Sequence, residues 1–87
     1  LSRERIADEI LKTLAIDDPT ETVALMIERG IFAPVVPEIA DADGLACLVS
    51  AELVTRTEPD PIRRLAALLP ADPEVAASVA ARLKLSN

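Results

Sequence analysis

Two close pairs of aspartates, Asp17-Asp18 and Asp41-x-Asp43, are the residues of this chain best suited to metal chemistry. A nucleotidyl-transfer site would need such a pair of carboxylates on Mg²⁺. Each pair, however, stands directly before a predicted helix, where a carboxylate accepts hydrogen bonds from free backbone N–H groups. We therefore predict that both pairs cap helices and that this segment holds no metal site.

Other common catalytic groups are missing from the sequence. Without histidine no Ser-His-Asp or Cys-His site can form, and one cysteine, Cys47, is too few for a structural zinc site. Gly30 and Gly44 stand apart and make no phosphate-binding loop. We predict no catalytic residue and expect Cys47 to lie in the core. Phe32, the sole aromatic residue, could stack on a base, but its place after Gly30 and beside Ile31 favours packing.

Two pairs of arginines stand in the first turns of predicted helices: Arg3 with Arg5, and Arg63 with Arg64. A cation in that position opposes the helix dipole and costs about 0.3 to 1 kcal/mol. A bound phosphate would reverse this penalty, because backbone N–H groups and guanidinium groups would then point at one anion. These four arginines are therefore the candidate contacts to RNA phosphates.

Two observations weigh against RNA contact. The formal net charge of −6 argues against strong binding of nucleic acid by this segment alone, although many of the carboxylates fall at predicted helix starts. The arginines also have acidic neighbours in the sequence, so local ion pairs are the alternative: Arg5 with Glu9, and Arg63 with Glu58 or Asp60. Both interpretations stay open on the sequence alone.

Three Asp-Pro pairs predict helix starts, because aspartate caps a helix well and proline fits its first position: Asp18-Pro19, Asp60-Pro61 and Asp72-Pro73. Gly30 predicts the end of the helix that begins at Pro19, so this helix covers residues 19–29.

Apolar residues with helical spacing complete the predicted elements. A first helix capped by Ser2 covers about 3–14, and the prolines in 34–40 allow only a short helical turn. Asp41 or Asp43 caps a helix to about Thr55, with an apolar stripe of Leu45, Leu48, Val49 and Leu53. Two further helices follow, marked by Ile62, Leu65, Ala66 and Leu69, and by Val75, Val79 and Leu83.

The predicted fold is therefore all-α, a compact bundle of about five helices plus one short turn. The 87 residues form one domain, 1–87. The start at Leu1 and an ending on Leu85, Ser86 and Asn87, typical of a following helix start, indicate a piece of a larger protein. A single cysteine, no leader and no long apolar run lead us to expect a cytoplasmic segment without a membrane partner.

Four stretches of the chain match short patterns in a fixed order. Residues 1–6 with Glu9 and Lys12 resemble S-x-E-R-I-x-x-E-x-x-K, and residues 26–32 with Pro37-Glu38 resemble L-M-x-x-x-G-[IL]-[LF] followed by [IL]-x-P-E. Residues 60–69 contain R-L-A-x-L-L, and residues 82–87 fit R-L-[KR]-L-S-N. Together they resemble the helical body that follows the neck in tRNA nucleotidyltransferases (CCA-adding enzymes) and poly(A) polymerases.

The resemblance implies a parent enzyme that adds nucleotides from CTP and ATP to tRNA 3′ ends without a nucleic-acid template, using Mg²⁺ on carboxylates of a head domain. The head motifs Gly-Gly-x-Val-Arg-Asp and Asp-x-Asp and the neck motif Glu-Asp-x-x-Arg have no counterpart here. The segment alone is therefore expected to be inactive and to bind neither cofactor nor DNA. In the family pattern, Glu4, Arg5 and Ile6 would brace the neck and meet RNA.

The sequence thus predicts a body domain that supports the neck and helps to position tRNA for nucleotide addition. The alternative is a helical protein-interaction or regulatory module without RNA binding, whose grooves take a partner helix.

Overall fold

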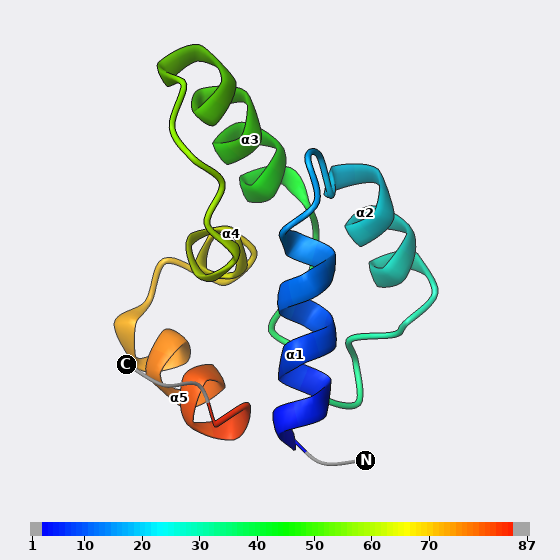
Figure 1. Cartoon of the computed structure of the whole chain (residues 1–87). Helices are drawn as coiled ribbons and strands as arrows, with labels where there is room; N and C mark the ends of the chain where they lie inside the picture. The colour runs from blue at the N-terminus through cyan, green and yellow to red at the C-terminus, as the bar shows by residue number, and fades with distance from the viewer. Residues whose placement is uncertain (1–2, 85–87) are drawn as a thin grey trace.

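The computed structural model describes residues 3–84, with side chains from residue 4 onward, and in this range it contains five α-helices and no strand (Figure 1). The helices are α1 (Arg3–Leu14), α2 (Thr20–Glu28), α3 (Asp43–Thr55), α4 (Pro61–Ala67) and α5 (Pro73–Arg82). The all-α prediction is confirmed. In place of one helical turn at 34–40 the chain forms two hydrogen-bonded turns, in which the N–H of Val36 donates to the carbonyl of Phe32 (2.6 Å) and that of Ile39 to the carbonyl of Val36 (3.1 Å). Ser2 and residues 85–87, with the predictions made for them, lie outside the described residues.

The starts of α4 and α5 follow directly from their Asp-Pro pairs. Asp60 accepts hydrogen bonds from the N–H groups of Ile62 (2.9 Å) and Arg63 (3.4 Å). Asp72 accepts one from Glu74 (2.9 Å). In both helices proline is the first residue, where no N–H donor is needed. Two of the predicted starts are therefore confirmed to the residue.

Asp72→Ala is expected to lower the free energy of unfolding by about 0.5 to 2 kcal/mol, because α5 would lose the acceptor at its first turn. Urea denaturation followed by circular dichroism measures the change. Asp8→Ala, which removes an exposed aspartate from inside α1, is the matched control and should have a smaller effect. Equal losses in the two variants would show that the cap of Asp72 does not stabilise α5.

The end of α2 is a glycine turn. Gly30 has a left-handed backbone (φ 70°), its N–H donates to the carbonyl of Ile27 (3.0 Å), and the N–H of Ile31 donates to that of Met26 (3.0 Å). These two bonds form a Schellman motif, in which only glycine adopts the positive φ without cost. The predicted stop is confirmed, and the turn leads the chain back so that Phe32 enters the core.

Helix α4 packs against α1 and α3, and its last residue lies at the start of α3. Helix α2 contacts the same two helices, and α2 and α4 lie on opposite sides of α1 (Figure 1). The contact between α3 and α4 is close, because a methyl group at Gly44 would overlap the carbonyl oxygen of Ala67. The last described residue reaches the start of α1, where the Nζ of Lys84 lies 3.5 Å from Oε1 of Glu4. Within residues 3–84 no helix is both long and apolar enough to cross a membrane.

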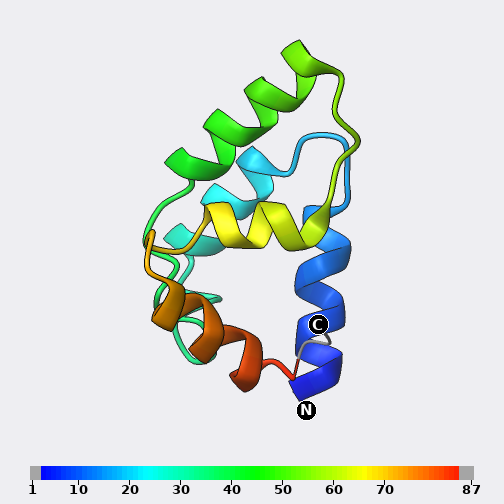
Figure 2. The same ribbon diagram turned by 90° about the vertical axis from the view of Figure 1, so that its left-hand side faces the viewer.

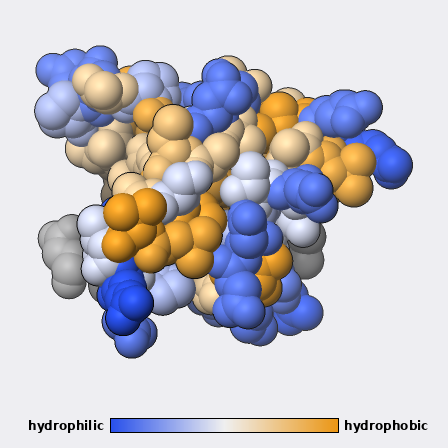
Figure 3. Space-filling model, turned by 90° about the horizontal axis from the view of Figure 1, so that it is seen from above, coloured by the Kyte–Doolittle hydropathy of each residue, from blue (hydrophilic) through white to orange (hydrophobic). Residues whose placement is uncertain are grey.

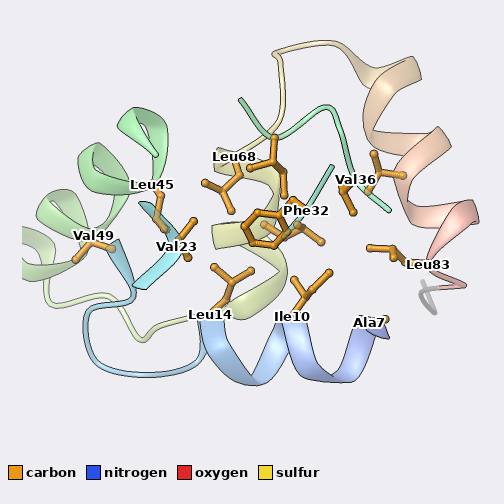
Figure 4. Close-up of a cluster of buried hydrophobic side chains, with 13 residues drawn as sticks. Ala7, Ile10, Leu14, Val23, Phe32, Val36, Leu45, Val49, Leu68 and Leu83 are labelled. Carbon is orange, nitrogen blue, oxygen red and sulfur yellow. The ribbon is translucent and has the colours of Figure 1, made fainter. Parts of the chain in front are cut away.

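One hydrophobic core joins all five helices and the 31–40 segment, with Phe32 near its middle (Figure 4). The side chain of Phe32 is only 4% exposed, so the packing prediction is confirmed. The buried hydrophobic residues are Ala7, Ile10, Leu14, Val23, Phe32, Val36, Ile39, Leu45, Val49, Leu65, Leu68, Val79 and Leu83.

Two predictions for α3 are wrong. Cys47 is exposed, because it is two residues from the buried Leu45 and therefore about 200° around the helix from it. Leu53 is 76% exposed although it lies on the core side of the helix. The reason is that the C-terminal turns of α3 extend past the helices that cover its first half (Figure 2).

Candidate nucleic-acid interface

The two arginine pairs, which the sequence offers either as phosphate contacts or as local ion pairs, lie at opposite ends of α1. The start of α4 is next to the end of α1, because Nη1 of Arg64 donates to the carbonyl of Leu14 (2.7 Å). Arg5 lies nine residues before Leu14, which is about 14 Å along the helix axis. The pairs therefore cannot converge on one anion. The side chain of Arg3 lies outside the described part of the chain, so its predicted role is not tested.

Arg64 is a buried structural residue. Its side chain is 2% exposed, and each of its five N–H donors has an acceptor within the protein. Nε and Nη2 donate to Oε1 of Glu52 (3.1 and 2.9 Å). The remaining bonds go to the carbonyls of Leu14 (2.7 Å), Ile16 (2.6 Å) and Asp17 (3.2 Å).

This arrangement accounts for a cation at the start of α4. The carbonyl groups at the end of α1 lack partners in their own helix and carry its negative dipole end, so they favour the guanidinium that α4 brings to them. Glu52 supplies the opposite charge from α3. The prediction that Arg64 contacts RNA phosphates is therefore wrong, since no donor of this side chain is left for a phosphate.

Arg63 is half-exposed and occupied by local partners. Its guanidinium lies 3.7 Å from Oδ2 of Asp60 and 3.6 Å from Oε2 of Glu52, and Nη1 donates to the backbone carbonyl of Glu58 (3.4 Å). The predicted pairing with Asp60 is confirmed, whereas Glu58 contributes its backbone and not its carboxylate. Arg63 thus lies among acidic groups, which is an unfavourable place for a phosphate.

Arg5 is exposed on α1 and lies at the edge of a shallow groove, which we call the Arg5 groove. It has a volume of about 350 Å³. One wall is α1 and the other is the end of α2 with the segment after it. The groove is lined by Arg5, Ile6, Glu9, Ile10, Thr13, Met26, Ile31, Phe32 and Val35. It combines an apolar floor with a few polar groups, as small ligand sites do.

One aspartate of each pair accepts a backbone hydrogen bond just before a helix, although the residues at the N-caps of α2 and α3 are Pro19 and Ala42, which have no side-chain cap. Oδ1 of Asp18 accepts a hydrogen bond from the N–H of Thr20 (3.0 Å), so α2 begins one residue later than expected. The bonds from Thr20 also hold the pKa of Asp18 below its usual value. Asp41 accepts in the same way from Asp43 (3.0 Å). Among residues 3–84 no group of three or more acidic or cysteine side chains is placed to hold a metal ion.

Arg82 has a structural role similar to that of Arg64, because it joins α5 to the segment before α3 by hydrogen bonds. Its two terminal nitrogens donate to the two carboxylate oxygens of Glu38 (2.7 Å each), and Nη1 also donates to the carbonyl of Val35 (3.1 Å). Mainly because of these bonds from Arg82, the pKa of Glu38 falls from 4.5 to about 2. Like Arg64, Arg82 belongs to a stretch on which the family resemblance rests, and both serve the fold.

Acid is expected to weaken the fold through Glu38. A carboxylate whose pKa is lowered by folding stabilises the folded state above its unfolded pKa, and this contribution is lost as the pH falls from about 4.5 to about 2. Glu38→Gln should therefore be less stable than the unmodified chain at pH 6, and the gap should narrow towards pH 2. Urea midpoints at several pH values test this, with Glu21→Gln, exposed in the first turn of α2, as the control. A gap independent of pH would contradict it.

The comparisons with known proteins concern the first half of the chain. Residues 1–43 match the family model described as "Probable RNA and SrmB- binding site of polymerase A". No curated protein and no solved structure matches. The first half of the chain is therefore similar to a region of poly(A) polymerases that is described as RNA-binding. The match covers α1, α2 and the turns up to the start of α3, and hence every residue that lines the Arg5 groove.

Proposed function

We propose that this chain is a helical RNA-binding segment of a nucleotidyltransferase related to poly(A) polymerases, and that it meets RNA at the Arg5 groove. One observation carries the proposal: the groove is built only from residues within the stretch that matches the RNA-binding family model. Among the predicted arginines whose side chains the structure describes, Arg5 lines this groove, whereas Arg64 is buried and Arg63 lies among carboxylates.

The chemistry of the groove suits a nucleotide. Arg5 lies in the first turns of α1, where free N–H groups give the helix a positive end. Lys12 follows seven residues later and therefore lies on the same side of α1. The apolar floor, with Ile31 55% exposed, offers a surface for a base or ribose. With a net charge of −6, the segment would add to binding by the rest of the enzyme and would not bind RNA strongly alone.

The finer role that we propose is support of the neck and positioning of the tRNA acceptor arm in a cytoplasmic enzyme. Catalysis, with Mg²⁺ and ATP or CTP, would belong to a head domain, whereas this segment would hold the RNA in position. The segment on its own should not transfer nucleotides to tRNA, and any turnover by a clean preparation would contradict this assignment.

The experiment uses the full-length parent and compares two variants, Arg5→Ala and Arg63→Ala. Both remove one positive charge, but Arg63 lies on α4, whose start is next to the opposite end of α1. Binding of labelled tRNA and of a poly(A) oligonucleotide is titrated at several salt concentrations. Removing one cation that neutralises a phosphate lowers the slope of log affinity against log salt by about 0.7 to 0.9. We expect Arg5→Ala to weaken binding and lower the slope by that amount, and Arg63→Ala to leave the slope unchanged.

Thermal melting first establishes that both variants are folded. An unchanged slope in folded Arg5→Ala would overturn the proposed RNA contact. Equal losses for tRNA and poly(A) would support RNA contact but contradict a dedicated tRNA role.

A further inference from the structure

We infer that a second groove, beside the end of α3, is a docking site for a cationic amphipathic helix of a partner protein. This α3 groove has a volume of about 520 Å³ and shares no residue with the Arg5 groove. The residues that matter for the argument are Asp17, Asp18, Val49, Glu52, Leu53 and Glu58. None of the reasoning depends on RNA binding.

The first observation is an uncovered apolar surface. Leu53 is 76% exposed and the adjacent Val54 is 84% exposed, more than any other large hydrophobic side chain of the described residues. Both belong to the last turn of α3, which extends beyond the helices that cover its start. Seen from above, the molecule exposes hydrophobic side chains directly beside strongly hydrophilic ones (Figure 3). Val49 continues the apolar wall into the groove.

The second observation is the charge around this wall. Four of the lining residues are acidic, and the exposed ones, Asp17, Asp18 and Glu58, lie on the turn after α1 and on the loop after α3. Two lining residues are arginines: Arg64 is paired with Glu52, and Arg56 is exposed, so the four carboxylates outnumber the cations by two. The groove is therefore negative.

The third observation is an acceptor without a donor. Glu52 lines the groove and is 5% exposed, and its Oε2 has no hydrogen-bond partner in the described structure. Nη1 of Arg63 is 3.6 Å away from it, beyond hydrogen-bonding distance. Buried polar groups normally have a partner, so this carboxylate favours a ligand that brings a donor.

These features together select the occupant. An apolar wall next to a row of carboxylates fits a helix with leucine-like side chains on one face and lysine or arginine beside them, the usual mode of helix-in-groove binding. RNA is disfavoured because its phosphates would meet the three exposed carboxylates of Asp17, Asp18 and Glu58. A second copy of this chain, with its net charge of −6, would be repelled.

The test uses the intact chain and a labelled synthetic peptide of leucine and lysine, patterned as an amphipathic helix. Its controls are a scrambled peptide of the same composition and a version with glutamate for lysine. We expect the patterned peptide to bind at least about tenfold more tightly than either control. Amide chemical shifts should change at residues 49–58 and at Asp17 and Asp18.

Two sets of variants identify the groove. Leu53→Ser should weaken peptide binding about tenfold, since it removes an apolar anchor, while Leu25→Ser, an exposed leucine on α2, should have no effect. Asp17→Asn with Glu58→Gln should weaken binding and reduce its salt dependence. Equal binding to Leu53→Ser and Leu25→Ser would overturn the inference. So would a change of the same amide shifts on adding an RNA oligonucleotide without the peptide, or a dimer that Leu53→Ser dissolves.

Discussion

Arg64→Met is expected to lower the free energy of unfolding by about 3 to 5 kcal/mol, the usual cost of breaking a buried ion pair by removing one partner. Methionine fills a similar volume but donates no hydrogen bond. Glu52 would keep its charge in a site where it is 5% exposed, and the carbonyls of Leu14, Ile16 and Asp17 would lose their donor. Urea denaturation measures the loss, which is a large part of the stability of a domain of this size.

The double variant Arg64→Met with Glu52→Leu separates the two causes of this loss. Removing the unpaired carboxylate should restore part of the stability, because an apolar pair in place of a buried ion pair is often tolerated. Recovery should stay incomplete, since the three carbonyls still lack the donor. Arg64→Lys should also be unstable, because one ammonium cannot reproduce the planar set of five donors. If Arg64→Met were as stable as the unmodified chain, the structural role of Arg64 would be disproved.

Phe32→Ala is expected to cost about 3 to 5 kcal/mol, since it leaves a cavity near the middle of the core. Phe32 is 4% exposed, whereas its neighbour Ile31 is 55% exposed. Ile31→Ala is therefore the matched control and should change stability much less, as surface substitutions usually do. The measurement is again the urea midpoint, supported by thermal melting.

Phe32→Leu separates packing from base stacking. Leucine keeps most of the apolar volume, so a packing role predicts a loss well below that of alanine and little change in the RNA affinity of the full-length parent. A stacking role would predict the reverse, with stability kept and RNA affinity reduced by the missing aromatic face. A clear loss of RNA affinity in a folded Phe32→Leu protein would contradict the core assignment.

Features set by local chemistry were predictable from the sequence. The Asp-Pro pairs at 60–61 and 72–73 fix two helix starts, because the capping oxygen and the proline act within three residues of each other. The glycine turn after α2 is equally local, with Gly30 at φ 70°. Such elements depend on no distant partner, so the sequence is enough to place them.

Features that depend on distant partners were not predicted. The exposure of Leu53 follows from where α2 and α4 stop covering α3, which no periodicity within α3 reveals. The role of Arg64 depends on carbonyls about fifty residues earlier in the chain. A signal was nevertheless present, because Arg64 precedes Leu68 by four residues and Glu52 follows Val49 by three. Both charges therefore lie on apolar stripes, which indicates a buried pair.

The hydrogen bonds from Arg64 to the end of α1 have a consequence for cooperativity and for how the chain can be divided. They join residues 14–17 to residue 64, across separations of 47 to 50 residues. A fragment ending at residue 43 would contain the whole stretch matched by the family model but would lack α4 and most of α3. The terminal carbonyls of its first helix would return to solvent, and Leu14 would lose its cover. In the intact chain, residues 1–43 and the residues after them should therefore unfold in one transition. The smallest autonomous folding unit should extend well beyond the matched stretch.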